Sequence, residues 1–73
     1  MLLKRIKELR IDNDLKQSEM AGILNCSQQV YSNYELGQRE IPLDILIELA
    51  NYYDVSVDYI LNRTDEPEIN RKR

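Results

Sequence analysis

Apolar residues recur every three or four positions along most of this 73-residue chain, and the pattern is broken at short intervals. Such spacing places apolar side chains on one face of a helix. No run of β-branched residues alternates with polar ones, as a half-exposed strand would require. The chain is also too short to fold into two domains. We therefore expect a single all-α domain made of short helices.

The breaks in the apolar spacing predict five helices, over residues 2–13, 17–24, 28–36, 43–53 and 57–61. The run at 12–14 ends the first helix, because acidic charge opposes the helix dipole at a C-terminus and Asn13 tolerates a left-handed cap. Asn25 suits a left-handed turn, and Ser27 is a good N-cap. These signals predict a tight turn before the third helix.

The second half of the chain has clear helix signals until residue 64. Gly37 is expected to end the third helix in the left-handed conformation. Pro42 suits the first turn of the fourth helix, and Ser56 is expected to cap the fifth. Residues 65–73 are mostly charged and include a proline. We expect them to form a disordered tail, leaving residues 1–64 as the domain.

Composition removes several kinds of chemistry. The chain has no histidine, which excludes His-based acid–base catalysis and His-ligated metal sites. Its one cysteine, Cys26, can form neither an internal disulfide nor a cysteine-based zinc site. We expect Cys26 to be a small apolar filler, with a thiol sensor as the alternative. We also expect no catalytic residue, metal, other cofactor or small-molecule ligand.

No apolar run reaches the length of a signal peptide or a membrane span. The chain does not depend on an oxidising compartment either. We therefore expect a cytoplasmic protein without a membrane partner.

Residues 17–36 read as two short helices joined by a tight three-residue turn at 25–27, the form of a helix-turn-helix. Any small helical bundle has short helices, so length alone does not define the motif. The outward face of the predicted third helix carries four uncharged polar residues, Gln28, Gln29, Ser32 and Asn33. Amides both donate and accept hydrogen bonds, which suits the major-groove edge of adenine. A base-reading face and an ordinary polar face are both consistent with this pattern.

Two stretches resemble the Cro/repressor (XRE-like) helix-turn-helix family. They read Leu-Lys-Gln-Ser-Glu-Met-Ala at 15–21 and Ser-Gln-Gln-Val-Tyr-Ser-Asn-Tyr-Glu-Leu-Gly-Gln-Arg-Glu-Ile-Pro at 27–42. Residues 49–61 resemble the usual ending of the family, so the resemblance extends from residue 1 to about residue 64. It implies a compact five-helix, lambda-repressor-like DNA-binding domain, with its helix-turn-helix at 17–36.

The resemblance also implies roles for individual side chains. Gln28 and Gln29 match positions that read bases, and Ser32 and Asn33 match positions that face the groove. Gln17 matches a phosphate-binding glutamine that also braces Gln28. A helix N-terminus suits phosphate in any case, through its free N–H groups.

Other matched positions concern packing. Ala21 matches the small residue that lets the two helices approach. Arg10 and Glu35 match a partly buried ion pair between the first and third helices. The alternative for these two residues is a pair of independent surface charges. We favour the ion pair because Arg10 lies on the apolar stripe of its helix.

Lys16, Ser27 and Arg39 are the further candidates for contact with the DNA backbone. Arg39 either enters a narrow minor groove or holds a phosphate, and a solvated loop charge is the alternative. Val30 either packs a thymine methyl group or is a neutral spacer. Glu40 departs from the family pattern, because it lies in a loop where a basic residue would help phosphate binding.

The function implied by the resemblance is sequence-specific transcriptional regulation, as a repressor of bacterial or phage type. A homodimer would bind a palindromic operator with its recognition helices about 34 Å apart, one turn of DNA. Residues 55–61 are the expected dimer surface. The first rival function is an interaction module, an antitoxin or accessory subunit, but the short tail leaves little chain for it. The second is an enzyme, for which no paired carboxylates are recognisable.

The net charge of −3 at first argues against a DNA-binding domain. Residues 1–42 hold six basic and six acidic residues, so the half with the helix-turn-helix is neutral. Residues 43–73 hold four basic and seven acidic residues and carry the whole net charge. With few cationic contacts per subunit, we expect DNA binding with a shallow dependence on salt.

Overall fold

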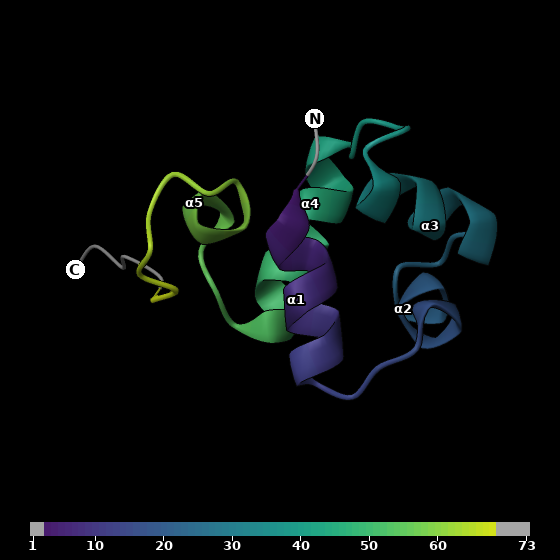
Figure 1. Ribbon diagram of the computed structural model, residues 1–73, viewed down its shortest axis with the longest axis horizontal. Helices are drawn as coiled ribbons and strands as arrows, with labels where there is room; N and C mark the ends of the chain where they lie inside the picture. The colour runs from purple at the N-terminus through teal and green to yellow at the C-terminus, as the bar shows by residue number, and fades with distance from the viewer. Residues whose placement is uncertain (1–2, 69–73) are drawn as a thin grey trace.

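A computed structural model describes residues 3–68, and all secondary structure in this range is helical (Figure 1). The helices are α1 (Lys4–Asp12), α2 (Gln17–Ile23), α3 (Gln28–Leu36), α4 (Leu43–Tyr53) and α5 (Val57–Ile60). The all-α prediction is confirmed. The predicted bounds of α3 and α4 agree with the structure, α1 is shorter than predicted at both ends, and α2 and α5 each end one residue earlier than predicted.

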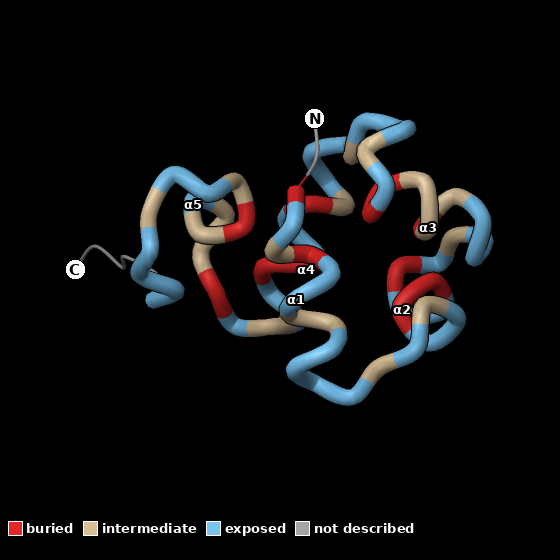
Figure 2. The backbone as a smooth tube through the Cα atoms, in the orientation of Figure 1, coloured by how far each residue is buried: buried red, intermediate tan, exposed pale blue. Residues whose placement is uncertain are grey.

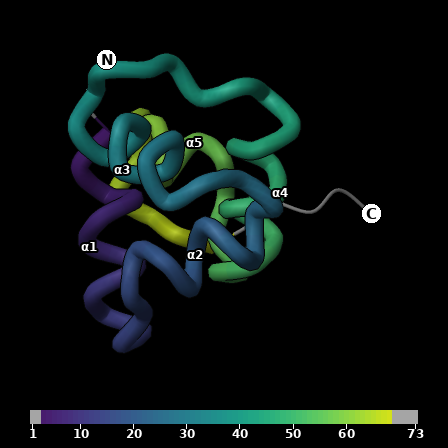
Figure 3. The backbone as a smooth tube through the Cα atoms, turned by 90° about the vertical axis from the view of Figure 1, so that its right-hand side faces the viewer, coloured from purple at the N-terminus to yellow at the C-terminus, as the bar shows by residue number. Residues whose placement is uncertain are grey.

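The five helices are arranged around α1 and α4. In Figure 1, α1 lies in front of α4, with α2 and α3 on the right and α5 on the left. Figure 3 looks onto the side that carries α2 and α3, which pack closely against each other. The predicted helix-turn-helix therefore lies on one side of the molecule, opposite α5.

The core receives one fully buried large side chain from each helix. These are Ile6, Met20, Tyr31, Leu49 and Ile60, each at most 1% exposed. The buried positions line the inner faces of the helices (Figure 2). Each such side chain contributes about 1.5–3 kcal/mol through removal from water. This shared core fixes the position of the short helices α2 and α3, which are too short to be stable alone.

The turn between α2 and α3 forms as the sequence predicts. Asn25 has φ 57° and Gly37, which ends α3, has φ 73°, so both are left-handed. The Oγ of Ser27 accepts a hydrogen bond from the backbone N–H of Val30 at 3.1 Å. Ser56 caps α5 in the same way. The start of α3 is therefore fixed by local hydrogen bonding as well as by the core.

Two local predictions need correction. The left-handed residue after α1 is Asp14, with φ 56°, whereas Asn13 has φ −98°. The side-chain amide of Asn13 instead donates to the carbonyl of Leu9 at 2.7 Å, which also accepts from the backbone N–H of Asn13. Pro42 is the N-cap of α4 rather than a residue of its first turn.

Arg5 ties the segment after α5 to α1. Its Nη1 donates to the carbonyl of Tyr59 at 2.9 Å and to that of Thr64, and its Nη2 lies 2.9 Å from Oδ1 of Asp65. The guanidinium carbon also lies 4.0 Å from the centre of the Tyr59 ring, a cation–π geometry. No pattern in the sequence indicated this contact.

The predicted tail begins at residue 65, but residues 65–68 lie against the helical body. Besides the contact of Asp65 with Arg5, the backbone N–H of Ser56 donates to the carbonyl of Pro67 at 2.9 Å. These contacts hold the start of the segment against the helical body, and no pattern in the sequence predicted them. The rest of the predicted tail, residues 69–73, lies outside the described residues.

Candidate nucleic-acid interface

The outer face of α3 presents the predicted base-reading residues. Gln28 and Gln29 are exposed in its first turn, and Ser32 and Asn33 are half-buried one turn later. Nε2 of Gln29 donates to Oδ1 of Asn33 at 3.2 Å, so each amide orients the other. The opposite face is anchored by Tyr31, which is fully buried. The core therefore fixes which face of α3 is available to a ligand.

Two residues beside this face pack against the core. Val30 is half-buried and contacts the core cluster. It therefore has a packing role, whether it also contacts a thymine methyl group or is a neutral spacer. Cys26 is also half-buried against the core, and burial raises the pKa of its thiol. A raised pKa disfavours the reactive thiolate, which supports the filler role over a thiol sensor.

The candidates for backbone contact lie on the surface. Lys16, Ser27 and Arg39 are all exposed. Among residues 3–68, the side chains of Lys16 and Arg39 have no hydrogen-bond or ion-pair partner. Oε1 of Glu19 accepts from the backbone N–H of Lys16 at 2.9 Å, which caps α2. That contact also places a carboxylate in the first turn of α2, which weakens any attraction there for an anion.

Arg10 and Glu35 form the predicted ion pair. Nε of Arg10 lies 2.7 Å from Oε2 of Glu35, and Nη2 lies 3.2 Å from Oε1. The two side chains are only 12% and 3% exposed. Nη1 of Arg10 also donates to the carbonyl of Leu15, just before α2, at 2.9 Å. The pair is therefore buried and bidentate, and the alternative of two independent surface charges is wrong.

Gln17 is oriented by Glu35 and not by Gln28. Its Nε2 donates to Oε1 of Glu35 at 3.0 Å. Within the described residues no hydrogen bond joins Gln17 to Gln28, so the bracing expected from the resemblance is not present. A buried carboxylate is a stronger acceptor than an exposed amide, which accounts for the difference. One carboxylate thus connects α1, α2 and α3.

Burial and hydrogen bonding act in opposite directions on Glu35. Burial raises the pKa of its carboxyl. Hydrogen bonds, led by that of Arg10 and including that of Gln17, lower the pKa by more than burial raises it, so the pKa lies below its usual range. The hydroxyls of Tyr31 and Tyr53 are buried without a hydrogen-bond partner in the described part of the chain. Burial raises the pKa of Tyr53 to about 12 and that of Tyr31 as well. The cluster is therefore built around an ionised carboxylate and two neutral phenols.

The lowered pKa of Glu35 predicts a loss of stability in acid. Well above pH 4.5, the ordinary pKa of this carboxyl, the ion pair contributes fully. As the pH falls below that value, the unfolded chain binds the proton first and the contribution is lost. Urea unfolding at a series of pH values should therefore show a steeper acid decline in the wild type than in the double variant Arg10→Met, Glu35→Met.

The matched control is Glu8→Gln, which removes an exposed carboxylate that has no partner among residues 3–68. This variant should follow the wild-type acid decline. An identical decline in the wild type and the double variant would show that Glu35 makes no special contribution.

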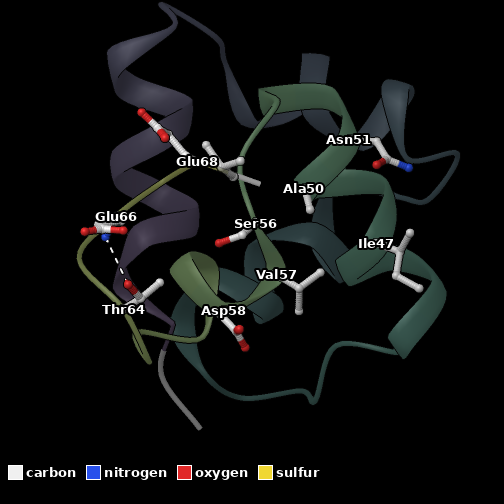
Figure 4. Close-up of a pocket in the computed structure, with 10 residues that line it drawn as sticks. Ile47, Ala50, Asn51, Ser56, Val57, Asp58, Thr64, Glu66 and Glu68 are labelled. Carbon is white, nitrogen blue, oxygen red and sulfur yellow. Dashed lines mark hydrogen bonds between the residues drawn. The ribbon is translucent and has the colours of Figure 1, made fainter. Parts of the chain in front are cut away.

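The expected dimer surface at residues 55–61 is partly wrong. Val55 and Ile60 are 7% and 1% exposed, because both point into the core. Val57 is half-buried and lines an open groove with Ile47 of α4, which is 44% exposed (Figure 4). Residues after α5, among them Glu66, border the same groove. The apolar surface at this end of the molecule thus comes from α4 and α5 together.

Two further features of residues 3–68 concern metals and membranes. No three His, Cys, Asp or Glu residues in this range are grouped so that they could hold a metal ion. None of the helices in the described range has the length and apolar character needed to cross a membrane.

Comparison with known proteins agrees with this geometry. A helix-turn-helix family model matches residues 6–60, which include all of α2, α3 and α4. The chain belongs to the helix-turn-helix family of the Cro/repressor (XRE) type.

The chain is similar to several curated proteins. The uncharacterized HTH-type transcriptional regulator YobD of Bacillus subtilis is 40% identical over 93% of this chain and 61% of its own length. The HTH-type transcriptional regulator ImmR of the same organism is 40% identical over 85% of this chain and 49% of its own. The cryptic phage CTXphi transcriptional repressor RstR of Vibrio cholerae is 28% identical over 89% of this chain and 59% of its own. The chain thus spans about half to three fifths of these relatives.

Proposed function

We propose that this chain is a sequence-specific DNA-binding transcriptional regulator, and that it acts as a repressor. The observation that carries the proposal is the outer face of α3, where exposed, uncharged amides lie on a helix anchored by the core. Similarity to proteins named as transcriptional regulators, one of them a phage repressor, supports it. Gln28 and Gln29 read base edges in the major groove, and Ser32 and Asn33 line the contact.

The backbone contacts are proposed around this helix. Gln17, Lys16 and Ser27 lie at or just before the starts of α2 and α3, and Arg39 follows α3. Side chains of these types bind phosphates without reading sequence, and they fix the register of the recognition helix. Because only two of these four are cationic, charge contributes little and the amides of α3 carry most of the discrimination.

We place the homodimer contact on the surface formed by α4 and α5. This surface includes Ile47 of α4 and Val57 of α5. The helix α5 lies on the opposite side of α1 from α3 (Figure 1). A two-fold axis there would relate the two recognition helices, and a palindromic site requires that both face the same duplex about 34 Å apart. Sedimentation of the chain with a duplex should give two chains per site.

Selection of binding sites from random duplex DNA tests the proposed function. We expect an enriched palindrome whose half-site centres are about 10 base pairs apart. Enrichment of a single, non-palindromic half-site would contradict the dimer but not the DNA reading. No enriched sequence at all would overturn the proposed function.

A further inference from the structure

We propose that Glu35 is the positioning residue for the phosphate contact of Gln17. The buried cluster of Arg10, Gln17 and Glu35 then affects the strength of DNA binding as well as the stability of the fold. This inference rests on the proposed function and concerns the same interface. Its basis is the hydrogen bond of 3.0 Å from Nε2 of Gln17 to Oε1 of Glu35.

Glu35 holds Gln17 from a fixed point. Its side chain is only 3% exposed, and its carboxylate accepts two hydrogen bonds from Arg10. A carboxylate held in this way cannot turn, so the amide that donates to it is held in one orientation. Arg10 also donates to the carbonyl of Leu15, which fixes the backbone two residues before Gln17. The side chain and its backbone are therefore restrained by one cluster.

The amide of Gln17 keeps a free donor in this arrangement. An amide nitrogen carries two hydrogens, and Glu35 accepts only one of them. Gln17 is half-buried at the first residue of α2, and no hydrogen bond among residues 3–68 uses the second hydrogen. Without Glu35 the long side chain would have to be ordered each time DNA binds, which lowers affinity.

The same carboxylate also links two helices whose positions the core fixes. Glu35 lies in the last turn of α3, and Gln17 begins α2. The phosphate contact and the base-reading helix are therefore connected by a single hydrogen bond. A loss of this bond should weaken the Gln17 contact specifically, whereas a loss of fold stability would act on every DNA contact alike.

The test is a double-mutant cycle on affinity for the selected palindrome. The background is Arg10→Met, Glu35→Met, which removes the partner of Gln17 without leaving a buried unpaired charge. In the wild type, Gln17→Ala should weaken binding about tenfold per subunit, the scale of one hydrogen bond to a charged group. In the background, the same substitution should cost less than about twofold, because the contact is already lost.

Lys16→Ala is the matched control, because Lys16 makes no contact with Glu35. Its effect on affinity, whatever its size, should be the same in both backgrounds. Circular dichroism melts confirm that each variant is folded at the binding temperature.

Two results overturn the inference while the proposed function stands: an equal cost of Gln17→Ala in both backgrounds, or no cost in the wild type. If the wild-type chain does not discriminate the selected duplex from its scrambled counterpart, the proposed function itself fails.

Discussion

Arg10→Met is expected to lower the free energy of unfolding by about 3 kcal/mol, because it leaves the carboxylate of Glu35 buried without its charged partner. Domains of this size hold about 4–10 kcal/mol in total, so the loss is a large fraction of the stability. The midpoint of thermal unfolding should fall by about 12–24 °C. Circular dichroism melts and urea titrations measure both quantities.

The double variant Arg10→Met, Glu35→Met separates the cost of an unpaired charge from the value of the pair. Buried ion pairs are often replaced by apolar side chains with little loss of stability. We therefore expect the double variant to recover most of what Arg10→Met loses. A double variant as unstable as the single one would show that the loss comes mainly from the missing pair and not from the orphaned carboxylate.

Gln28→Ala and Gln29→Ala are expected to abolish the preference for the base pair that each side chain contacts. A bidentate amide–adenine contact is worth about 1–3 kcal/mol of discrimination. The effect should appear at symmetric positions of the two half-sites, because each subunit carries the same helix. Binding-site selection with each variant shows which positions lose their preference.

Gln38→Ala is the control for this experiment. It removes a glutamine amide from the loop after α3 rather than from its outer face. Its selected site should be unchanged, even if its affinity is lower. An unchanged site for Gln28→Ala and Gln29→Ala would mean that the reading face has been assigned to the wrong residues.

The helices were predictable because their limits depend on neighbouring residues. Ser27 and Ser56 cap α3 and α5 through backbone N–H groups three residues away, and Gly37 ends α3 by its own left-handed conformation. Asn13 was predicted less well, because its side chain had two acceptable roles and the structure uses the other one. Local signals therefore give the elements but not every cap.

The contacts between distant residues were only partly predictable. The pair of Arg10 and Glu35 followed from the family resemblance, but the hydrogen bond of Gln17 to Glu35 spans 18 positions and left no local pattern. The same holds for Arg5 and Asp65, which are 60 positions apart. Such contacts depend on how the helices pack around the core. The spacing of residues within one helix does not show how that helix packs against the others.

The most direct test of DNA reading is the ratio of affinities for the selected palindrome and for a scrambled duplex of the same length, measured over a series of salt concentrations. The outer face of α3 predicts a preference of at least about a thousandfold for the palindrome. The small number of cationic contacts predicts a slope of log affinity against log salt well below the value near ten seen for strongly cationic binders. Equal affinity for both duplexes, with a steep slope, would contradict sequence-specific reading by the amides of α3.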